Sequence, residues 1–129
     1  MTKTVKVKPT DAELEILAVL WERGASTVRD VHEALAESKP IGYTTILKLM
    51  QIMHDKGLLE RDDSNRAHVY EAKHPKENMQ RQIVGDLLDK VFAGSAMNLV
   101  MHALETKRSS AAELAQIRDL LDEFERGEK

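Results

Sequence analysis

The sequence predicts a mainly α-helical fold with one small β-hairpin. Apolar residues recur at helical spacing through most of the chain, which predicts amphipathic helices. A cluster of turn-forming residues separates two strand-like runs after the third of these helices, which predicts the hairpin. A His-Pro pair at 74–75 then marks a boundary, and the pattern beyond it is helical to the end. We therefore divide the chain into domains at 1–74 and 75–129.

The composition limits the classes of protein to which the chain can belong. The chain has 129 residues, which fits one domain or two small ones, and its apolar content of 42% is enough for a core. It has no cysteine, which excludes disulfides, thiolate metal sites and cysteine nucleophiles. No apolar run is long enough to span a bilayer and the start does not resemble a signal peptide. We expect a cytoplasmic protein without membrane insertion.

The formal net charge is −3, which argues against simple bulk attraction to nucleic acid. Residues 1–73 carry 11 Lys and Arg against 12 Asp and Glu, a balance of −1, and the remainder carries 8 against 10, a balance of −2. Neither part is basic overall. Any attraction for phosphate must therefore come from a local patch.

The first two helices follow from their caps and apolar spacing. The first is expected near 11–23, where Thr10 and Glu13 form a capping box and Gly24 is a natural stop. The segment 25–27 is short enough to pair only as a minor strand, and Ser26 or Thr27 can cap a second helix. That second helix buries a stripe made by Val28, Val31 and Leu35.

A third helix is expected near 43–56, with Gly57 at its end. Strands at 58–61 and 67–72 follow it, joined by a polar turn at 62–65. This is the order of a recognition helix and a wing, so the first domain is predicted to be a winged helix-turn-helix. The inward side of the third helix carries Ile46, Leu49, Met50 and Met53.

Short polar side chains and a lysine gather on the outward side of the third helix. A helix fits the DNA major groove, where hydroxyls and amides reach base edges and a lysine reaches phosphate or guanine. Two arginines flank the wing turn and would contact the backbone or the minor groove. The alternatives are a solvated helix face and an ordinary surface hairpin. The candidate DNA-binding residues are Tyr43, Thr44, Thr45, Lys48, Gln51, Arg61 and Arg66.

The C-terminal part reads as about three short helices, which cannot bury a core by themselves. A second copy of the chain is the simplest partner, and two-fold symmetry is the commonest arrangement. The last helix carries a heptad-like seam, which we interpret as a dimer face rather than core within one chain. The residues expected at the dimer interface are Leu87, Val91, Val100, Leu114, Ile117, Leu121 and Phe124.

Motifs for catalysis and for metal binding are missing from the sequence. No two of the five histidines have metal-ligand spacing, and there is no phosphate loop, nucleophile elbow or convincing acid pair. We expect no enzyme activity, no metal and no cofactor. The rival functions are a winged helix used only for protein contacts, a small hydrolase, and a regulator of another family that senses a small ligand.

An ordered set of motifs resembles the penicillinase repressor family, the BlaI/MecI/CopY type. The set begins with Thr10-Asp11-Ala12-Glu13-Leu14-Glu15-Ile16-Leu17 and continues through Leu20-Trp21, Tyr43-Thr44-Thr45-Ile46, Lys56-Gly57-Leu58-Leu59, Arg61 and Arg66-Ala67-His68-Val69-Tyr70. Each motif is weak alone, and the order makes the set specific. The resemblance covers the first 75 residues well and the rest loosely.

The resemblance implies a homodimeric repressor that binds an inverted-repeat operator in double-stranded DNA and lowers transcription. It assigns major-groove reading to Thr44, Thr45 and Lys48, and it places Arg66 in the wing. In the antibiotic-responsive members, which control genes of β-lactam resistance, a membrane sensor protease triggers cleavage in the C-terminal helices. The matching place here is near His102-Ala103, although the Asn-Phe pair at which some members are cut is absent. The copper-responsive branch uses a cysteine cluster that this chain lacks.

Overall fold

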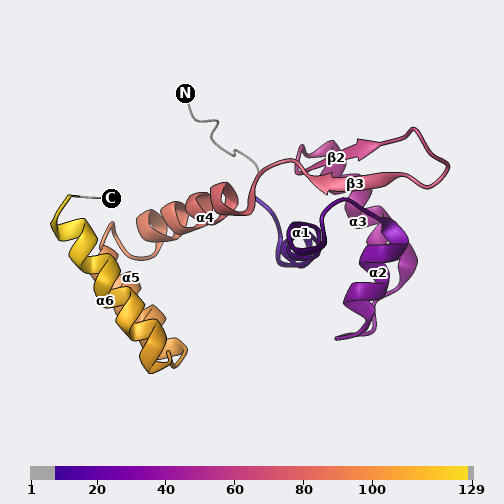
Figure 1. The fold of residues 1–129 in the computed structure, drawn as a ribbon. Helices are drawn as coiled ribbons and strands as arrows, with labels where there is room; N and C mark the ends of the chain where they lie inside the picture. The colour runs from indigo at the N-terminus through magenta and orange to yellow at the C-terminus, as the bar shows by residue number, and fades with distance from the viewer. Residues whose placement is uncertain (1–7, 128–129) are drawn as a thin grey trace. The chain divides into compact units, whose positions relative to one another are not determined.

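The computed structural model describes residues 8–127, and Figure 1 shows the fold as a ribbon. The described part is mainly helical with one small antiparallel sheet, which confirms the predicted fold class. The elements in chain order are α1 (Asp11–Arg23), β1 (Ser26–Thr27), α2 (Val28–Ala36), α3 (Tyr43–Asp55), β2 (Leu59–Asp62), β3 (Val69–Ala72), α4 (Lys76–Lys90), α5 (Ala96–Thr106) and α6 (Ala111–Glu125).

Local hydrogen bonds fix the beginnings of α1 and α2. At α1, the Thr10 hydroxyl accepts from the Glu13 amide at 3.2 Å, and the Glu13 carboxylate accepts from the Thr10 amide at 2.9 Å. At α2, Thr27 and Asp30 make the same reciprocal pair, both bonds at 3.1 Å. Both helices therefore have the capping box that satisfies first-turn amides. Gly24 follows α1 with φ of 84°, a left-handed region that suits glycine.

The sheet has the order β1-β3-β2, so β3 is the central strand. Asp62 pairs with Val69 at the wing end of the hairpin, while Thr27 of β1 pairs with the same Val69 from the other side. The predicted strands at 58–61 and 67–72 were therefore off by one residue and two residues at their wing ends. The Ser64 amide donates to the Asp62 side chain at 2.9 Å, which starts the turn only after Asp62.

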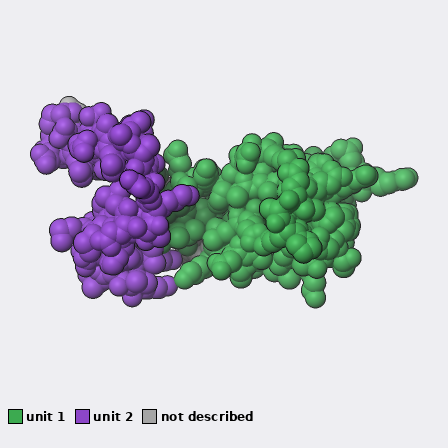
Figure 2. Space-filling model, turned by 90° about the horizontal axis from the view of Figure 1, so that it is seen from below, with its two compact units in different colours: residues 1–85 green, residues 86–129 purple. Residues whose placement is uncertain are grey.

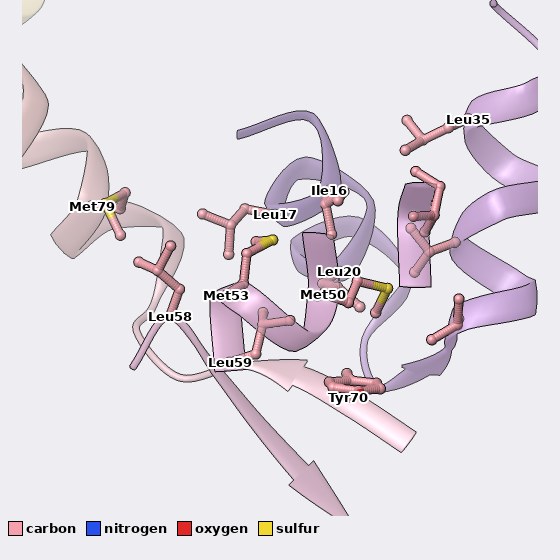
Figure 3. Close-up of a cluster of buried hydrophobic side chains, with 13 residues drawn as sticks. Ile16, Leu17, Leu20, Leu35, Met50, Met53, Leu58, Leu59, Tyr70 and Met79 are labelled. Atoms are coloured by element: carbon pink, nitrogen blue, oxygen red, sulfur yellow. The ribbon is translucent and has the colours of Figure 1, made fainter. Parts of the chain in front are cut away.

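A cluster of fully buried apolar side chains joins the first three helices to the sheet (Figure 3). Trp21 is only half-buried, and its indole Nε1 donates to the His74 carbonyl at 3.0 Å. This bond ties α1 to the segment that follows the hairpin. The core side chains include Ile16, Leu17, Leu20, Val31, Ile46, Met50, Met53, Leu58, Leu59, Tyr70 and Met79.

The chain forms two compact units, coloured separately in Figure 2. The first extends through Gly85 and the second begins at Asp86. Met79 on α4 is buried in the core of the first unit and Ile83 packs against that core. The division made from the sequence after residue 74 thus falls earlier than the division in the structure, because the first turns of α4 belong to the first unit.

The second unit leaves many of its apolar side chains exposed. Neither α5 nor α6 has a buried residue. Of the residues expected at a dimer interface, Leu114 and Ile117 are half-buried, and the others are exposed, with Val91 at 66%. The described part of the chain contains no helix with the length and apolar content needed to cross a bilayer. The exposed members of the set are Leu87, Val91, Val100, Leu121 and Phe124.

Candidate nucleic-acid interface

The third helix separates cleanly into a buried side and an exposed side. Ile46, Met50 and Met53 are fully buried, because they pack into the core of the first unit. The opposite side is solvent-exposed and polar apart from Ile52, which is 39% exposed. The exposed side carries Tyr43, Thr44, Thr45, Lys48, Gln51 and Asp55. Its residue types are those that meet base edges and phosphates in a major groove.

A groove of about 550 Å³ lies between this helix and the wing. The start of α2 closes a third side, because β1 pairs with β3 and holds Thr27 against the sheet. Two arginines and one histidine from separate parts of the chain, Arg29, Arg66 and His68, line it. The lining residues are Thr27, Val28, Arg29, Tyr43, Leu47, Gln51, Arg66, Ala67, His68 and Tyr70.

The two wing arginines have different surroundings. Arg66 is exposed in the loop and lines the groove. Arg61 lies on β2, is half-buried, and its Nε is 2.7 Å from the Asp63 carboxylate. Hydrogen bonding to Tyr70, and then to Asp63, raises the pKa of Arg61 above its ordinary value. The structure thus brings Arg66 to the groove beside α3 but engages Arg61 within the hairpin.

The acidic residues of the wing turn are engaged by their neighbours. Hydrogen bonds from Ser64 hold the pKa of Asp62 below its ordinary value. Asp63 lies between Arg61 and His68, whose Nδ1 is 3.4 Å from its carboxylate. The Arg61–Asp63 pair has no net charge, so Arg66 is the exposed cation of the loop.

The structure therefore brings together only part of the predicted site. Tyr43, Gln51 and Arg66 share the groove, whereas Thr44, Thr45 and Lys48 lie on the exposed helix side without lining it. Arg61 lines a different depression, between β2 and β3, together with acidic residues. The groove residues that the sequence reasoning missed are Thr27, Arg29 and His68.

A buried ion pair anchors the other end of the third helix. Lys56 follows α3 directly, and its Nζ lies 2.7 Å from the carboxylate of Glu13, which is 2% exposed. Burial raises the pKa of Glu13, but the bonds from Lys56 and the Thr10 amide outweigh burial and hold that pKa below its ordinary value. The pair fixes α3 against α1.

No constellation for metal chemistry accompanies this surface. Within residues 8–127, His, Asp and Glu side chains form no group of three that could hold a metal ion. The architecture of helices, exposed third helix and wing is that of a winged helix-turn-helix protein. The candidate site is a surface formed by one side of α3 and the wing loop.

The model of the penicillinase repressor family matches residues 9–123, and the chain belongs to that family. It is 32% identical over 119 residues to the transcriptional regulator BlaI of Mycobacterium tuberculosis, covering 91% of this chain and 85% of that protein. It is 22% identical to the penicillinase repressor of Bacillus licheniformis, covering 93% and 94%. Membership confirms the resemblance seen in the sequence and the expectation of a regulator rather than an enzyme.

A solved structure shares the fold of the first unit. The solution structure of the monomeric form of Bacillus licheniformis BlaI, in complex with the blaP half-operator, matches with a TM-score of 0.51 at 22% identity. The match covers 59% of this chain and 93% of that chain. It supports the winged-helix architecture.

Proposed function

We propose that the chain is a transcriptional repressor that binds an inverted-repeat operator in double-stranded DNA as a homodimer. The observation that carries this proposal is the exposed polar side of α3, which borders a groove shared with the wing. Family membership and the half-operator bound by the Bacillus licheniformis relative support it. Repression follows by occlusion, because a bound dimer covers the operator.

In this proposal α3 enters the major groove and the wing follows the phosphate backbone. Thr44, Thr45 and Lys48 read bases or contact phosphate from the exposed helix side. Tyr43, Gln51 and Arg66 contact the strand that lies between helix and wing, and Arg29 and His68 add charge to the same groove. We retain Arg61 mainly as a residue that holds the hairpin, since its guanidinium is paired with Asp63.

We propose that the homodimer forms through the exposed apolar side chains of the second unit. Large exposed apolar patches on a soluble domain mark sites of association. Two-fold pairing through this unit would present two recognition helices to successive major grooves, about 34–36 Å apart. Two copies also present two local cationic patches to one duplex, so the attraction for phosphate comes from these patches and not from the net charge, which is −3 on each chain.

We propose a membrane sensor protease as the trigger of repressor release, and this proposal rests only on the family resemblance. His102 and Ala103 are exposed, but both lie in the last turns of α5, where the Thr106 hydroxyl donates to the His102 carbonyl at 2.6 Å. Cleavage there would require α5 to unwind first, because a protease takes an extended segment. A protein that binds an operator must lie in the compartment that holds the DNA. A cytoplasmic location therefore follows from the proposed function and is itself a prediction.

The test is DNA binding by the full-length chain at two salt concentrations. The probe is a duplex that the protein itself selects from a random-sequence pool, with a scrambled duplex as control. We expect preferential binding of the selected duplex, weakening steeply with salt, since each phosphate contact contributes about −0.9 to the log–log slope. A chain used only for protein contacts would bind neither duplex in a salt-dependent way, and that result would refute the proposal.

A further inference from the structure

Helix α3 begins without the capping box that starts α1 and α2. Thr27 caps α2 and Thr10 caps α1, each through a reciprocal capping box. The N-cap of α3 is Gly42, which has no side chain, and no side-chain hydrogen bond caps the helix. Something else must hold the beginning of α3, which carries the polar face used for DNA.

His32 on α2 makes two contacts that converge on this beginning. Its Nε2 lies 2.8 Å from the carbonyl oxygen of Ile41, in the turn just before α3. Its ring meets the ring of Tyr43, the first residue of α3, edge to face, with centroids 5.8 Å apart and an interplanar angle of 80°. Edge-to-face geometry is the favoured arrangement for such pairs.

The hydrogen-bond chemistry assigns a definite role to the imidazole. A carbonyl oxygen can only accept, so Nε2 carries the proton and donates to Ile41. His32 is half-buried, whereas Tyr43 is 47% exposed and lines the groove beside Arg66. The tyrosine ring is thus in contact with His32, while the exposed part of its side chain is free to meet the proposed DNA strand.

We propose that His32 is a positioning residue for operator recognition, which sets the beginning of α3 and the orientation of Tyr43 without touching DNA. This inference rests on the proposed function. Its physical basis is preorganisation: a side chain already held in its bound orientation loses less entropy on binding. His32 therefore acts on affinity for the selected sequence and leaves the general attraction for phosphate unchanged.

The first experiment measures dissociation constants of full-length His32→Ala for the selected duplex and for a scrambled duplex. We expect the selected duplex to bind about tenfold more weakly, from the loss of a hydrogen bond and an aromatic contact. We expect binding to the scrambled duplex to change less than about twofold, since no phosphate contact is removed. Equal weakening on both duplexes, or no weakening on either, would overturn the inference.

A double-mutant cycle tests whether the effect passes through Tyr43. If it does, His32→Ala should change affinity by less than about twofold in a Tyr43→Ala background, because the side chain it orients is gone. Full additivity of the two changes would refute the route. His32→Phe retains a ring beside Tyr43 but no donor to Ile41, and we expect it to recover part of the lost affinity.

The Gly42→Ser change distinguishes a positioning role of His32 from an effect of His32 on the stability of the fold alone. Gly42 has φ of −76° and ψ of 149°, and an added Cβ would meet only Thr45 Oγ1 at 3.8 Å, so a serine cap fits there. In a His32→Ala background this cap should restore the melting temperature while the selected duplex still binds weakly, relative to Gly42→Ser alone. Full recovery of affinity with the cap would mean that His32 only stabilises the fold. If the unaltered chain binds no duplex, the proposed function itself fails.

Discussion

Replacing Lys56 with Met should destabilise the first unit far more than the loss of an ordinary surface ion pair. The Nζ atom of Lys56 lies 2.7 Å from the Glu13 carboxylate. Among the described residues, no other cation is seen within hydrogen-bond distance of that carboxylate. The Glu13 side chain is 3% exposed and that of Lys56 is 31% exposed. Without the ammonium, the buried carboxylate keeps its hydrogen bonds from Thr10, among them that of the Thr10 amide at 2.9 Å, but loses its positively charged partner.

The size of the effect follows from burial. Removing one partner of a fully buried pair costs about 3–5 kcal/mol, because the other charge stays buried without compensation. Water reaches Lys56, so we expect a smaller loss of about 2 kcal/mol in the free energy of unfolding. For a domain of this size that corresponds to a fall of roughly 10 °C in melting temperature. Thermal unfolding followed by circular dichroism measures it.

Lys39→Met is the matched control. Lys39 also pairs with α1, through Glu15 at 2.6 Å, but both side chains are more than 40% exposed. Exposed pairs contribute less than about 1 kcal/mol. We expect Lys39→Met to lower the melting temperature only slightly. The Glu13→Gln, Lys56→Met double variant should be more stable than Lys56→Met alone, since it buries no unpaired charge.

The pH dependence gives an independent check. The folded-state pKa of Glu13 lies below its ordinary value of 4.5, so the pair stabilises the fold above about that pH. This stabilisation is lost as the pH falls through the lowered folded-state pKa. The gap between the unaltered chain and Lys56→Met should therefore be full at neutral pH and narrow in acid. Equal losses for Lys56→Met and Lys39→Met, with no dependence on pH, would mean that burial gives the Glu13–Lys56 pair no additional stabilising effect.

Three further predictions concern the DNA surface and the dimer. Thr45→Ala or Lys48→Ala should weaken binding of the selected duplex with the melting temperature unchanged, and Lys48→Ala should reduce the salt slope by about 1. Fluorescence anisotropy measures the affinity and its salt dependence, and unchanged affinity in both variants would remove this assignment. Arg66→Ala should weaken selected and scrambled duplexes alike in the same assay if it contacts phosphate, and a loss confined to the selected duplex would contradict that role. Ile117→Asp or Leu121→Asp should yield monomers by analytical ultracentrifugation with weaker operator binding, and a dimer that survives both changes would place the interface elsewhere.

Local sequence signals were sufficient for the helices of the first unit. The Thr10–Glu13 box and Gly24 predicted both ends of α1, because capping involves residues three positions apart. The buried side of α3 followed from apolar spacing, although Leu49 is only half-buried. The strand ends were less well predicted, since they depend on the pairing of β1 with β3, across more than 40 positions of sequence.

Long-range contacts account for what the sequence could not provide. The sequence around Glu13 does not predict its contact with Lys56, and the sequence around His32 does not predict its contact with Tyr43. Each pair comes into contact only when the helices pack together. Arg61 and Arg66 looked equivalent in the sequence, and only the hairpin geometry pairs one of them with Asp63. No residue of α5 or α6 is buried, and the dimer interface on these helices stays a prediction.

The proposed function requires that the exposed side of α3 and the wing loop bind duplex DNA in two copies. Nuclear magnetic resonance titration of the full-length chain with the selected duplex measures this contact residue by residue. We predict shifts of backbone amides at 43–55 and 63–68, saturating at two chains per duplex. Shifts confined to the second unit, or none within 43–55 at saturation, would contradict the account.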